Sequence, residues 1–433
     1  MAPFAVLFLA CGMALLWVPA FWLARACAMD RAAHQRAAAP FGLRRFRPMA
    51  VLACAWGLAE LSRASLFTGF PWAMPSHMLV DSVLGQGAAW VGASGLNPLL
   101  FAFAGGLALL LQSGRSLLAL VGAGLFAALM AWSPAPQPVE PHRPLVRLVQ
   151  TSAPQHLRWD PDHMLSFFQN ALHSTEAKDS TSARPPDLVV WPETAVPYLL
   201  EHAQAALQRV VQARQGTPFV LGIMRREDGR TMNSAIMVDR QGQVAQVYDK
   251  LRLVPFGEYV PFVPWLQQWG VRGLAAPMFD GFRAGTQRQL MQISGVGRAL
   301  VLICYEAIFA RDIRAYGERP DFLLNLSNDG WFGQFAGPSQ FLVQARIRAI
   351  EFGLPVGRAT NTGISALIDA RGQIRASVPL GVAGYVDSLL PPPLPPPLYA
   401  RSGDLPLMVV LLALGLACAW PPLAETMRRR FKP

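Results

Sequence analysis

The chain has 433 residues, of which 52% are hydrophobic and only 15% are charged, and its mean hydropathy is +0.28. This composition excludes a protein that is soluble throughout and indicates membrane-spanning segments. The formal net charge of +11 does not call for a nucleic-acid partner, because much of the excess flanks the apolar segments.

Apolar segments of about 20 residues, the length that crosses a bilayer as a helix, lie near both ends of the chain. They predict five spans, at roughly 4–23, 49–67, 95–112, 116–132 and 405–421. The first lacks the basic start and the small-residue cleavage site of a signal peptide, which favours a span. The Gly- and Ala-rich stretch 79–94 is predicted to be interfacial. Glu60 and Arg63, three residues apart, are spaced to pair on one helix face.

Lys and Arg residues predict the orientation, because they accumulate in cytoplasmic loops. If the spans alternate, the Arg-rich loop after the first span, Arg115 and the basic tail 428–432 share one side. That side is predicted to be cytoplasmic, which places the region 133–404 outside the cytoplasm.

The region 133–404 is long enough for one large domain. Pro-rich stretches at 133–144 and 391–397 bound it and are typical of stiff spacers. Apolar runs predict strands at 145–150, 187–193, 219–224, 233–239, 299–306 and 321–328, and intervening stretches predict helices at 161–178, 198–214 and 338–352. With a hairpin signal at 239–243, this order predicts an α/β or α+β sandwich. The predicted domains are therefore 1–132 with four spans, 133–404, and 405–433 with the last span and a basic tail.

Cys304 is the one cysteine of five that lies in the region 133–404, so it has no disulfide partner within that domain. An unpaired thiol in an oxidising compartment suggests a reactive role. The alternative is a buried strand cysteine that behaves as a small hydrophobe. The sequence around Cys304 does not by itself decide between these interpretations.

A thiol nucleophile needs a base and a group that stabilises an oxyanion. The histidines of the region lie in helix-like or loop contexts, whereas two charged residues lie at strand ends. Glu193 closes DLVVWPE, and Lys250 follows a strand in VYDKLRLVPFGEYVP. These side chains would converge with Cys304 at one end of a sheet, although a lone Glu or Lys is more often a solvated surface charge.

WPET, YDKLRLVPFGEYVP and LICYE, in this order, resemble the carbon–nitrogen hydrolase (nitrilase) superfamily. TGFPW, QHLRWDP, NDGWFG and the flanking spans resemble one branch of it, the apolipoprotein N-acyltransferase family, from about residue 1 to about 425. The resemblance implies an α+β fold in which a nitrilase-like αββα sandwich joins a transmembrane helical bundle. It also implies the bacterial inner (cell) membrane, with the catalytic domain in the periplasm.

The resemblance further implies a Glu193–Lys250–Cys304 triad that moves a phospholipid sn-1 acyl chain, through a thioester on Cys304, to the amine of a diacylglyceryl-cysteine lipoprotein. In this scheme Glu193 is the general base, with a pKa expected to be raised by an apolar pocket. Lys250 would stabilise the oxyanion and favour the thiolate. No metal or nucleotide is implied as a cofactor. The expected partners are a phospholipid donor such as phosphatidylethanolamine, the diacylglyceryl apolipoprotein and the membrane, with no nucleic acid, and a monomer is expected.

The resemblance also implies supporting roles for four residues. Glu306 is expected to orient Lys250, Glu258 to position the acid–base group, Tyr305 to shape an acyl pocket, and Trp159 to lie on a loop at the entrance. Separately, the apolar segment 260–279 predicts a lid that dips into the bilayer interface. Its candidate substrate-contacting residues are Trp265, Leu266, Trp269 and Leu274.

The family typically has eight spans, so five predicted spans leave three unaccounted for before residue 1. A shortened form or a misplaced start is the expectation from this difference. Two other functions stay open, namely a membrane-tethered amidase that uses water as acceptor, and an inactive shortened form that serves as a binding protein.

Overall fold

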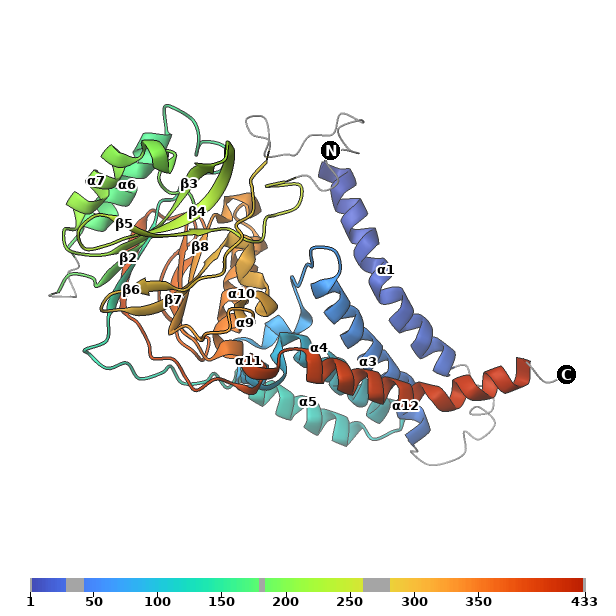
Figure 1. The fold of residues 1–433 in the computed structure, drawn as a ribbon. Coiled ribbons are helices and arrows are strands. Elements are labelled where there is room, and N and C mark those ends of the chain that lie inside the picture. Colours follow the sequence, from blue (N-terminus) through green and yellow to red (C-terminus); the bar gives the residue numbers. More distant parts are fainter. Residues whose placement is uncertain (1, 29–42, 179–183, 260–280, 431–433) are drawn as a thin grey trace, which may run out of the picture. The chain divides into compact units, whose positions relative to one another are not determined.

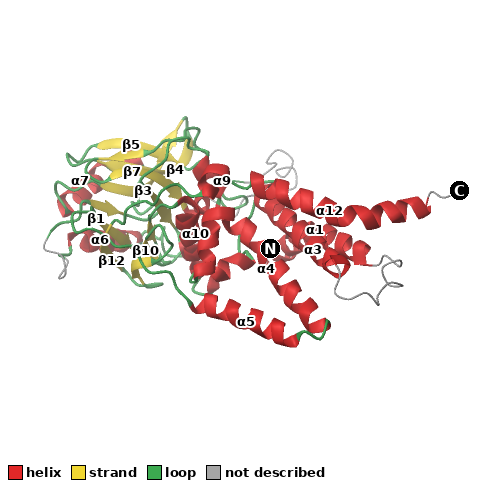
Figure 2. Cartoon of the chain, turned by 90° about the horizontal axis from the view of Figure 1, so that it is seen from below, coloured by secondary structure: helices red, strands yellow, loops and turns green. Residues whose placement is uncertain are grey.

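The computed structural model describes residues 2–28, 43–178, 184–259 and 281–430. The chain divides into two compact units (Figure 1). Residues 1–134 and 397–433 form a unit whose described elements are helices, here called the helical unit. Residues 135–396 form the second, here called the sandwich unit, which contains all the described strands (Figure 2). The boundaries lie close to the predicted 133 and 404.

In the described part of the chain, the helical unit is built mainly from five long helices. They are α1 (Ala2–Ala28), α3 (Leu43–Ser65), α4 (Ala88–Gln112), α5 (Ser116–Ala131) and α12 (Leu405–Arg430), with the short η1 (Pro75–Leu79), η2 (Val83–Gly87) and α11 (Leu398–Ser402) beside them. Helix α3 packs against α1, α4 and α12. Helix α4 begins earlier than the predicted span at 95 and is kinked at Gly92, whose φ of 68° is readily adopted by glycine.

Two helical segments are long and apolar enough to cross a membrane, Leu7–Ala28 and Val83–Gln112, and Ser116–Ala131 and Leu405–Ala419 are shorter apolar helices. Only the described residues were tested for segments of this length and hydropathy. The predicted span at 49–67 is helical up to Ser65 but does not meet the same criteria, and α3 carries several charged residues. The membrane crossing of five helices therefore stays a prediction.

Glu60 and Arg63 form the predicted ion pair, with 2.5 Å between Arg63 Nη2 and Glu60 Oε2, and both are buried. Arg63 Nη1 also donates to the carbonyl oxygens of Phe70 (2.7 Å) and Trp72 (2.8 Å). The pair therefore fixes the turn 70–72 that follows α3.

The sandwich unit contains two six-stranded sheets. The first has the order β12-β1-β2-β3-β4-β5, with β1, β2 and β3 parallel. The second has the order β11-β10-β9-β8-β7-β6, with β7, β8 and β9 parallel. The strands are β1 (Leu145–Gln150), β2 (Leu188–Val190), β3 (Phe219–Glu227), β4 (Arg230–Val238), β5 (Val244–Asp249), β6 (Met291–Ile293), β7 (Gly297–Ile303), β8 (Phe322–Ser327), β9 (Val356–Thr360), β10 (Ser365–Ile368), β11 (Ile374–Val378) and β12 (Gly384–Leu389).

The two sheets pack face to face, with β1 against β9 and β10, and helices cover their outer faces (Figure 1). Helices α6 (Met164–Glu176) and α7 (Gln204–Ala213) cover the first sheet, and α10 (Ala336–Phe352) covers the second, near the short α9 (Ala310–Arg314). Strands β1, β2 and β8 are buried along their whole length. A strand buried on both faces is mostly apolar, which is the pattern that predicts these strands, although β1 also buries Arg147 and β8 buries Asn325. The αββα sandwich is therefore confirmed.

The Pro-rich stretches differ from the predicted spacers, because polar contacts bind both of them to the sandwich unit. Gln137 N donates to Asp369 Oδ2 (2.8 Å), and Gln137 Oε1 accepts from Ala370 N (2.9 Å). On the other side, Arg319 Nη2 donates to the carbonyl oxygen of Leu394 (2.6 Å). Proline content predicts stiffness, but it does not reveal whether a stiff segment lies against a surface.

Candidate active site

Glu193 lies just beyond the end of β2, in a turn that is packed tightly from one side. Its side chain is buried, and Thr194 after it has a φ of 44°, which is strained for a β-branched residue. Gly222 on β3 approaches this turn so closely that an added Cβ would lie 2.4 Å from Thr194 N and 2.6 Å from Glu193 Cα. The absence of a side chain at Gly222 therefore lets the turn carry Glu193 where it does.

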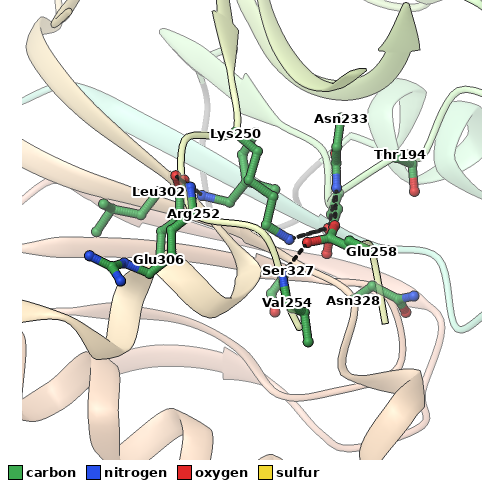
Figure 3. A network of polar contacts seen from close by, with 12 residues as sticks. Thr194, Asn233, Lys250, Arg252, Val254, Glu258, Leu302, Glu306, Ser327 and Asn328 are labelled. Atoms are coloured by element: carbon green, nitrogen blue, oxygen red, sulfur yellow. Dashed lines mark hydrogen bonds and ion pairs between the residues drawn. The ribbon is translucent and has the colours of Figure 1, made fainter. Parts of the chain in front are cut away.

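Lys250 directly follows β5 and is almost fully buried. Its Nζ lies 2.8 Å from Glu258 Oε1 and 3.3 Å from Glu193 Oε1. Asn233 on β4 donates from Nδ2 to the same two oxygens, over 2.6 Å to Glu193 and 3.1 Å to Glu258 (Figure 3). The ammonium and amide groups thus hold two carboxylates side by side, one from each of two strand-end segments.

Cys304 follows the end of β7 and begins the short helix η4 (Cys304–Ile308). Its φ of 49° places it in the left-handed region, a strained conformation that clusters at functional sites. Burial, and then the charge of Glu193, raise the pKa of the Cys304 thiol to about 12 despite the opposing effect of Lys250. The resting group is therefore a thiol: Lys250 favours the thiolate, as predicted, but burial outweighs this effect.

Glu306 connects the Cys304 turn to the segment after Lys250. Its Oε2 accepts from Ile303 N (2.7 Å), and its Oε1 accepts from Leu251 N (2.7 Å) and Arg252 N (3.1 Å). Tyr248 Oη donates to both oxygens. Burial raises the pKa of Glu306 to about 7 against these backbone hydrogen bonds. Glu306 thus holds the backbone just before Cys304 and just after Lys250.

The pKa of Glu193 differs from the sequence prediction. Burial acts to raise it, but the charges of Lys250 and Arg158 and the hydrogen bond from Asn233 hold the pKa below its ordinary value. Burial lowers the pKa of Lys250, yet Glu193 and Glu258 raise it above its ordinary range. The predicted raised pKa of Glu193 is therefore wrong for this state, because its pocket contains cations as well as apolar groups.

The remaining predicted residues fall into three groups. Glu258 joins the cluster directly, and its Oε2 accepts from Val254 N (2.8 Å). Tyr305, next to Cys304, packs edge-on against Phe309 with ring centroids 4.9 Å apart, and Trp159 is 43% exposed beside Arg158. The predicted lid residues lie outside the described residues; they are Trp265, Leu266, Trp269 and Leu274.

Sequence reasoning missed Asn233 and Arg158, which both contact Glu193 or its turn. Asn233 begins the stretch NSAIMVD and lies within the buried strand β4, where a polar residue was an available signal. Arg158 precedes Trp159 in QHLRWDP, but its contact spans 35 residues and leaves no local signal.

The arrangement suits acyl transfer to and from a thiol. Glu193 Oε2 is buried and has no hydrogen-bond partner among the described residues, so it can accept a proton. Lys250 supplies a fixed positive charge beside it. Among the described residues, no group of three or more His, Cys, Asp or Glu side chains is placed to hold a metal ion.

Comparison with known proteins extends the likeness over most of the chain. The family model described as "Carbon-nitrogen hydrolase" matches residues 145–387, and "Apolipoprotein N-acyltransferase N-terminal domain" matches residues 1–107. An apolipoprotein N-acyltransferase from Rhizobium meliloti (strain 1021) is 39% identical over 367 residues, which cover 80% of this chain and 68% of that protein. One from Brucella melitensis biotype 1 is 38% identical over 405 residues, which cover 88% of this chain and 74% of that protein.

Among solved structures, a mutant of an amidase of the nitrilase superfamily from Nesterenkonia AN1 is 19% identical, with a TM-score of 0.44 over 62% of this chain and 97% of that one. The two family models together extend from the first residue to the last strand of the sandwich unit. The chain belongs to the apolipoprotein N-acyltransferase family.

Proposed function

We propose that this chain transfers the sn-1 acyl chain of a phospholipid, with phosphatidylethanolamine as the expected donor, to the N-terminal amine of a diacylglyceryl-cysteine lipoprotein. The observation that carries the proposal is the buried cluster of Glu193, Asn233, Lys250 and Glu258, whose charged members interact electrostatically with the strained Cys304. Family membership supplies the substrate class, and the apolar helices of the helical unit support a lipid donor.

In the first half-reaction, Glu193 takes the proton of the Cys304 thiol as the sulfur attacks the ester carbonyl carbon. The carbonyl oxygen becomes an oxyanion, which the ammonium group of Lys250 stabilises. The tetrahedral intermediate then breaks its bond to the glycerol oxygen, which receives the proton from Glu193. Lysophospholipid leaves, and the acyl chain remains on Cys304 as a thioester.

In the second half-reaction, the lipoprotein amine attacks the thioester carbonyl and Glu193 accepts an amine proton. Collapse of the second tetrahedral intermediate forms the amide bond and expels the sulfur, which regains its proton from Glu193. A thioester is reactive enough for this step without an energy-rich cofactor. Proton shuttling suits a carboxylate whose second oxygen has no other partner among the described residues.

The placement of the protein belongs to the same proposal. A multi-pass protein of the bacterial cell membrane, with its sandwich unit on the periplasmic side, accounts for the apolar helices and the flanking basic residues. Lipid substrates would reach the site from the outer leaflet of that membrane. The roles of Tyr305 as part of an acyl pocket, of Trp159 at the entrance, and of the segment 260–279 as a lid remain part of this proposal, as does a monomeric state.

The test is the intact mass of the purified full chain after incubation with phosphatidylethanolamine, for the wild type and Cys304→Ala. The expected result is a gain of one fatty-acyl mass in the wild type, removed by hydroxylamine and absent from the variant. Adding a diacylglyceryl-cysteine peptide should then move the acyl group to the peptide amine. Release of free fatty acid in place of peptide acylation would instead favour an enzyme that uses water as acceptor, and no mass gain would contradict the proposal.

A further inference from the structure

Arg158 contacts the turn that carries Glu193, and no role in the acyl-transfer steps above has been given to it. Its Nη2 donates to the carbonyl oxygen of Glu193 and to both the carbonyl oxygen (2.7 Å) and the Oγ1 of Thr194. The arginine is buried, with 8% of its surface exposed. The buried guanidinium group donates to two consecutive backbone carbonyl oxygens and so stabilises the strained backbone conformation of Thr194.

Arg158 offsets the negative charge of the group formed by Glu193, Glu258 and Lys250. Glu193 and Glu258 carry two negative charges, while Lys250 carries one positive charge, and all three side chains are largely buried. Arg158 supplies the second positive charge, because burial lowers its pKa only to about 10 and leaves it protonated at neutral pH. Uncompensated buried charge is unfavourable, so the positive charge of Arg158 stabilises the two carboxylates in this cluster.

The segment that carries Arg158 is also bound to the other sheet of the sandwich. Gln155 Oε1 accepts from Asn328 Nδ2 (2.7 Å), and Asn328 follows β8 directly. The ring of the exposed Trp159 lies 5.3 Å from the Arg158 guanidinium carbon. The turn 155–159 therefore fastens the strand ends of the two sheets to each other beside the reacting groups.

We propose that Arg158 is a positioning residue for acyl transfer, which fixes the turn that carries Glu193 and supplies the second positive charge beside this carboxylate. The inference rests on the proposed function, because it requires Glu193 to act as the base. Loss of the charge should make Glu193 harder to ionise, since burial would then be opposed mainly by Lys250. Loss of the Nη2 hydrogen bonds with retention of the charge should instead misplace the turn.

The experiment measures the rate at which iodoacetamide alkylates Cys304 in the full-length chain, without lipid, from pH 4 to pH 9. Peptide mass analysis separates Cys304 from the other four cysteines. The variants are Arg158→Gln, Arg158→Lys and, as a matched control, Arg209→Gln, which removes an exposed arginine from α7. A carboxylate base gives this rate a decline on the acid side, and its midpoint reports the ionisation of Glu193.

In Arg158→Gln the midpoint should move to higher pH by about 1 unit or more, since an adjacent cation commonly lowers a carboxyl pKa by about 1–3 units. In Arg158→Lys the midpoint should stay in place while the plateau rate falls severalfold. Arg209→Gln should match the wild type. A purely structural role would lower the rates without moving the midpoint.

An Arg158→Gln variant whose rate has no acid-side decline at higher pH than the wild type would overturn the inference. If Arg158→Gln fails to fold, Arg158→Lys decides, because a wild-type plateau in that variant would equally refute a positioning role. Parallel incubation with phosphatidylethanolamine separates the two proposals. If Arg158→Gln shifts the midpoint but the wild type never gains an acyl mass, the proposed donor is refuted and the role of Arg158 stands.

Discussion

At the scale of single residues, the two carboxylate oxygens of Glu193 have different surroundings. Oε1 accepts from Asn233 and Lys250, whereas Oε2 has no hydrogen-bond partner among the described residues. Glu193→Gln keeps the shape but cannot take a proton, so we expect acyl-enzyme formation to fall by roughly 10²–10⁴-fold. Rapid-quench mass analysis of the acyl-enzyme measures this rate.

The control for that substitution is Glu176→Gln, which neutralises an exposed carboxylate at the end of α6. It should acylate at the wild-type rate. An acylation rate of Glu193→Gln within about threefold of the wild type would remove Glu193 from the role of base.

Glu306 predicts a pH dependence of stability. Burial raises its pKa from 4.5 to about 7, so the folded state binds this proton more tightly than the unfolded state. Its contribution to stability is full below pH 4.5 and is lost as the pH rises through about 7. We expect the free energy of unfolding of the wild type, relative to Glu306→Gln, to fall by about 1–3 kcal/mol between pH 4.5 and pH 8.

Thermal unfolding of both proteins across this range measures the difference. The lowered pKa of Glu193 acts in a separate window, because its contribution is present above its ordinary pKa of 4.5 and is lost as the pH falls through its folded-state value. A difference between wild type and Glu306→Gln that is constant with pH would show that Glu306 ionises normally.

At the scale of elements, strand β3 and the Glu193 turn depend on Gly222. A methyl group there would meet backbone atoms of residues 192–194 at 2.4–2.6 Å, and backbone cannot rotate away as a side chain can. We expect Gly222→Ala to cost about 1–3 kcal/mol of stability and to lower acyl-enzyme formation strongly. Chemical unfolding and acylation assays on the same preparation measure both effects.

Gly229→Ala is the comparison, because this glycine lies in the β3–β4 turn with a φ of 76° and open space around it. Its substitution should reduce stability by about 1 kcal/mol through backbone strain while Cys304 still acylates. Equal loss of acylation in both variants would mean that Gly222 affects folding alone.

The sequence predicts several buried strands and the strand-end residues for one physical reason, although it misses the buried strands β9 and β10. Parallel strands buried on both faces are rich in apolar residues, and a charged residue that ends such a run is conspicuous, as Glu193 is after DLVVWP. Strands β11 and β12 escape the same reasoning because they are mostly partly exposed and carry polar residues. Arg158 and Asn233 escape it because their partners lie on other elements, and pairing across elements leaves no periodic pattern in the chain.

At the scale of the whole molecule, the Pro-rich segment at each end of the sandwich unit is hydrogen-bonded to the rest of that unit. Gln137 is buried and is held on both its backbone and its side chain by residues 369–370. Gln137→Ala loses the side-chain bond and leaves Ala370 N unpaired, so we expect a cost of about 1–3 kcal/mol and faster proteolysis within 133–144. Limited proteolysis followed by mass analysis locates the cuts.

Gln241→Ala, an exposed change in the β4–β5 turn, should leave the cutting pattern unchanged. Unchanged proteolysis of Gln137→Ala would show that the segment is held by other contacts.

The first and last strands of the sandwich unit are antiparallel neighbours, with Leu145 paired to Leu389. The two ends of this unit therefore lie next to each other. A domain whose two ends lie close together can be inserted into another polypeptide without distorting that polypeptide. Exchange of residues 145–389 for the corresponding stretch of a relative would give a chimera whose helical unit keeps its own connections. Such grafts would allow the chemistry of the module and the lipid supply of its host to be varied separately.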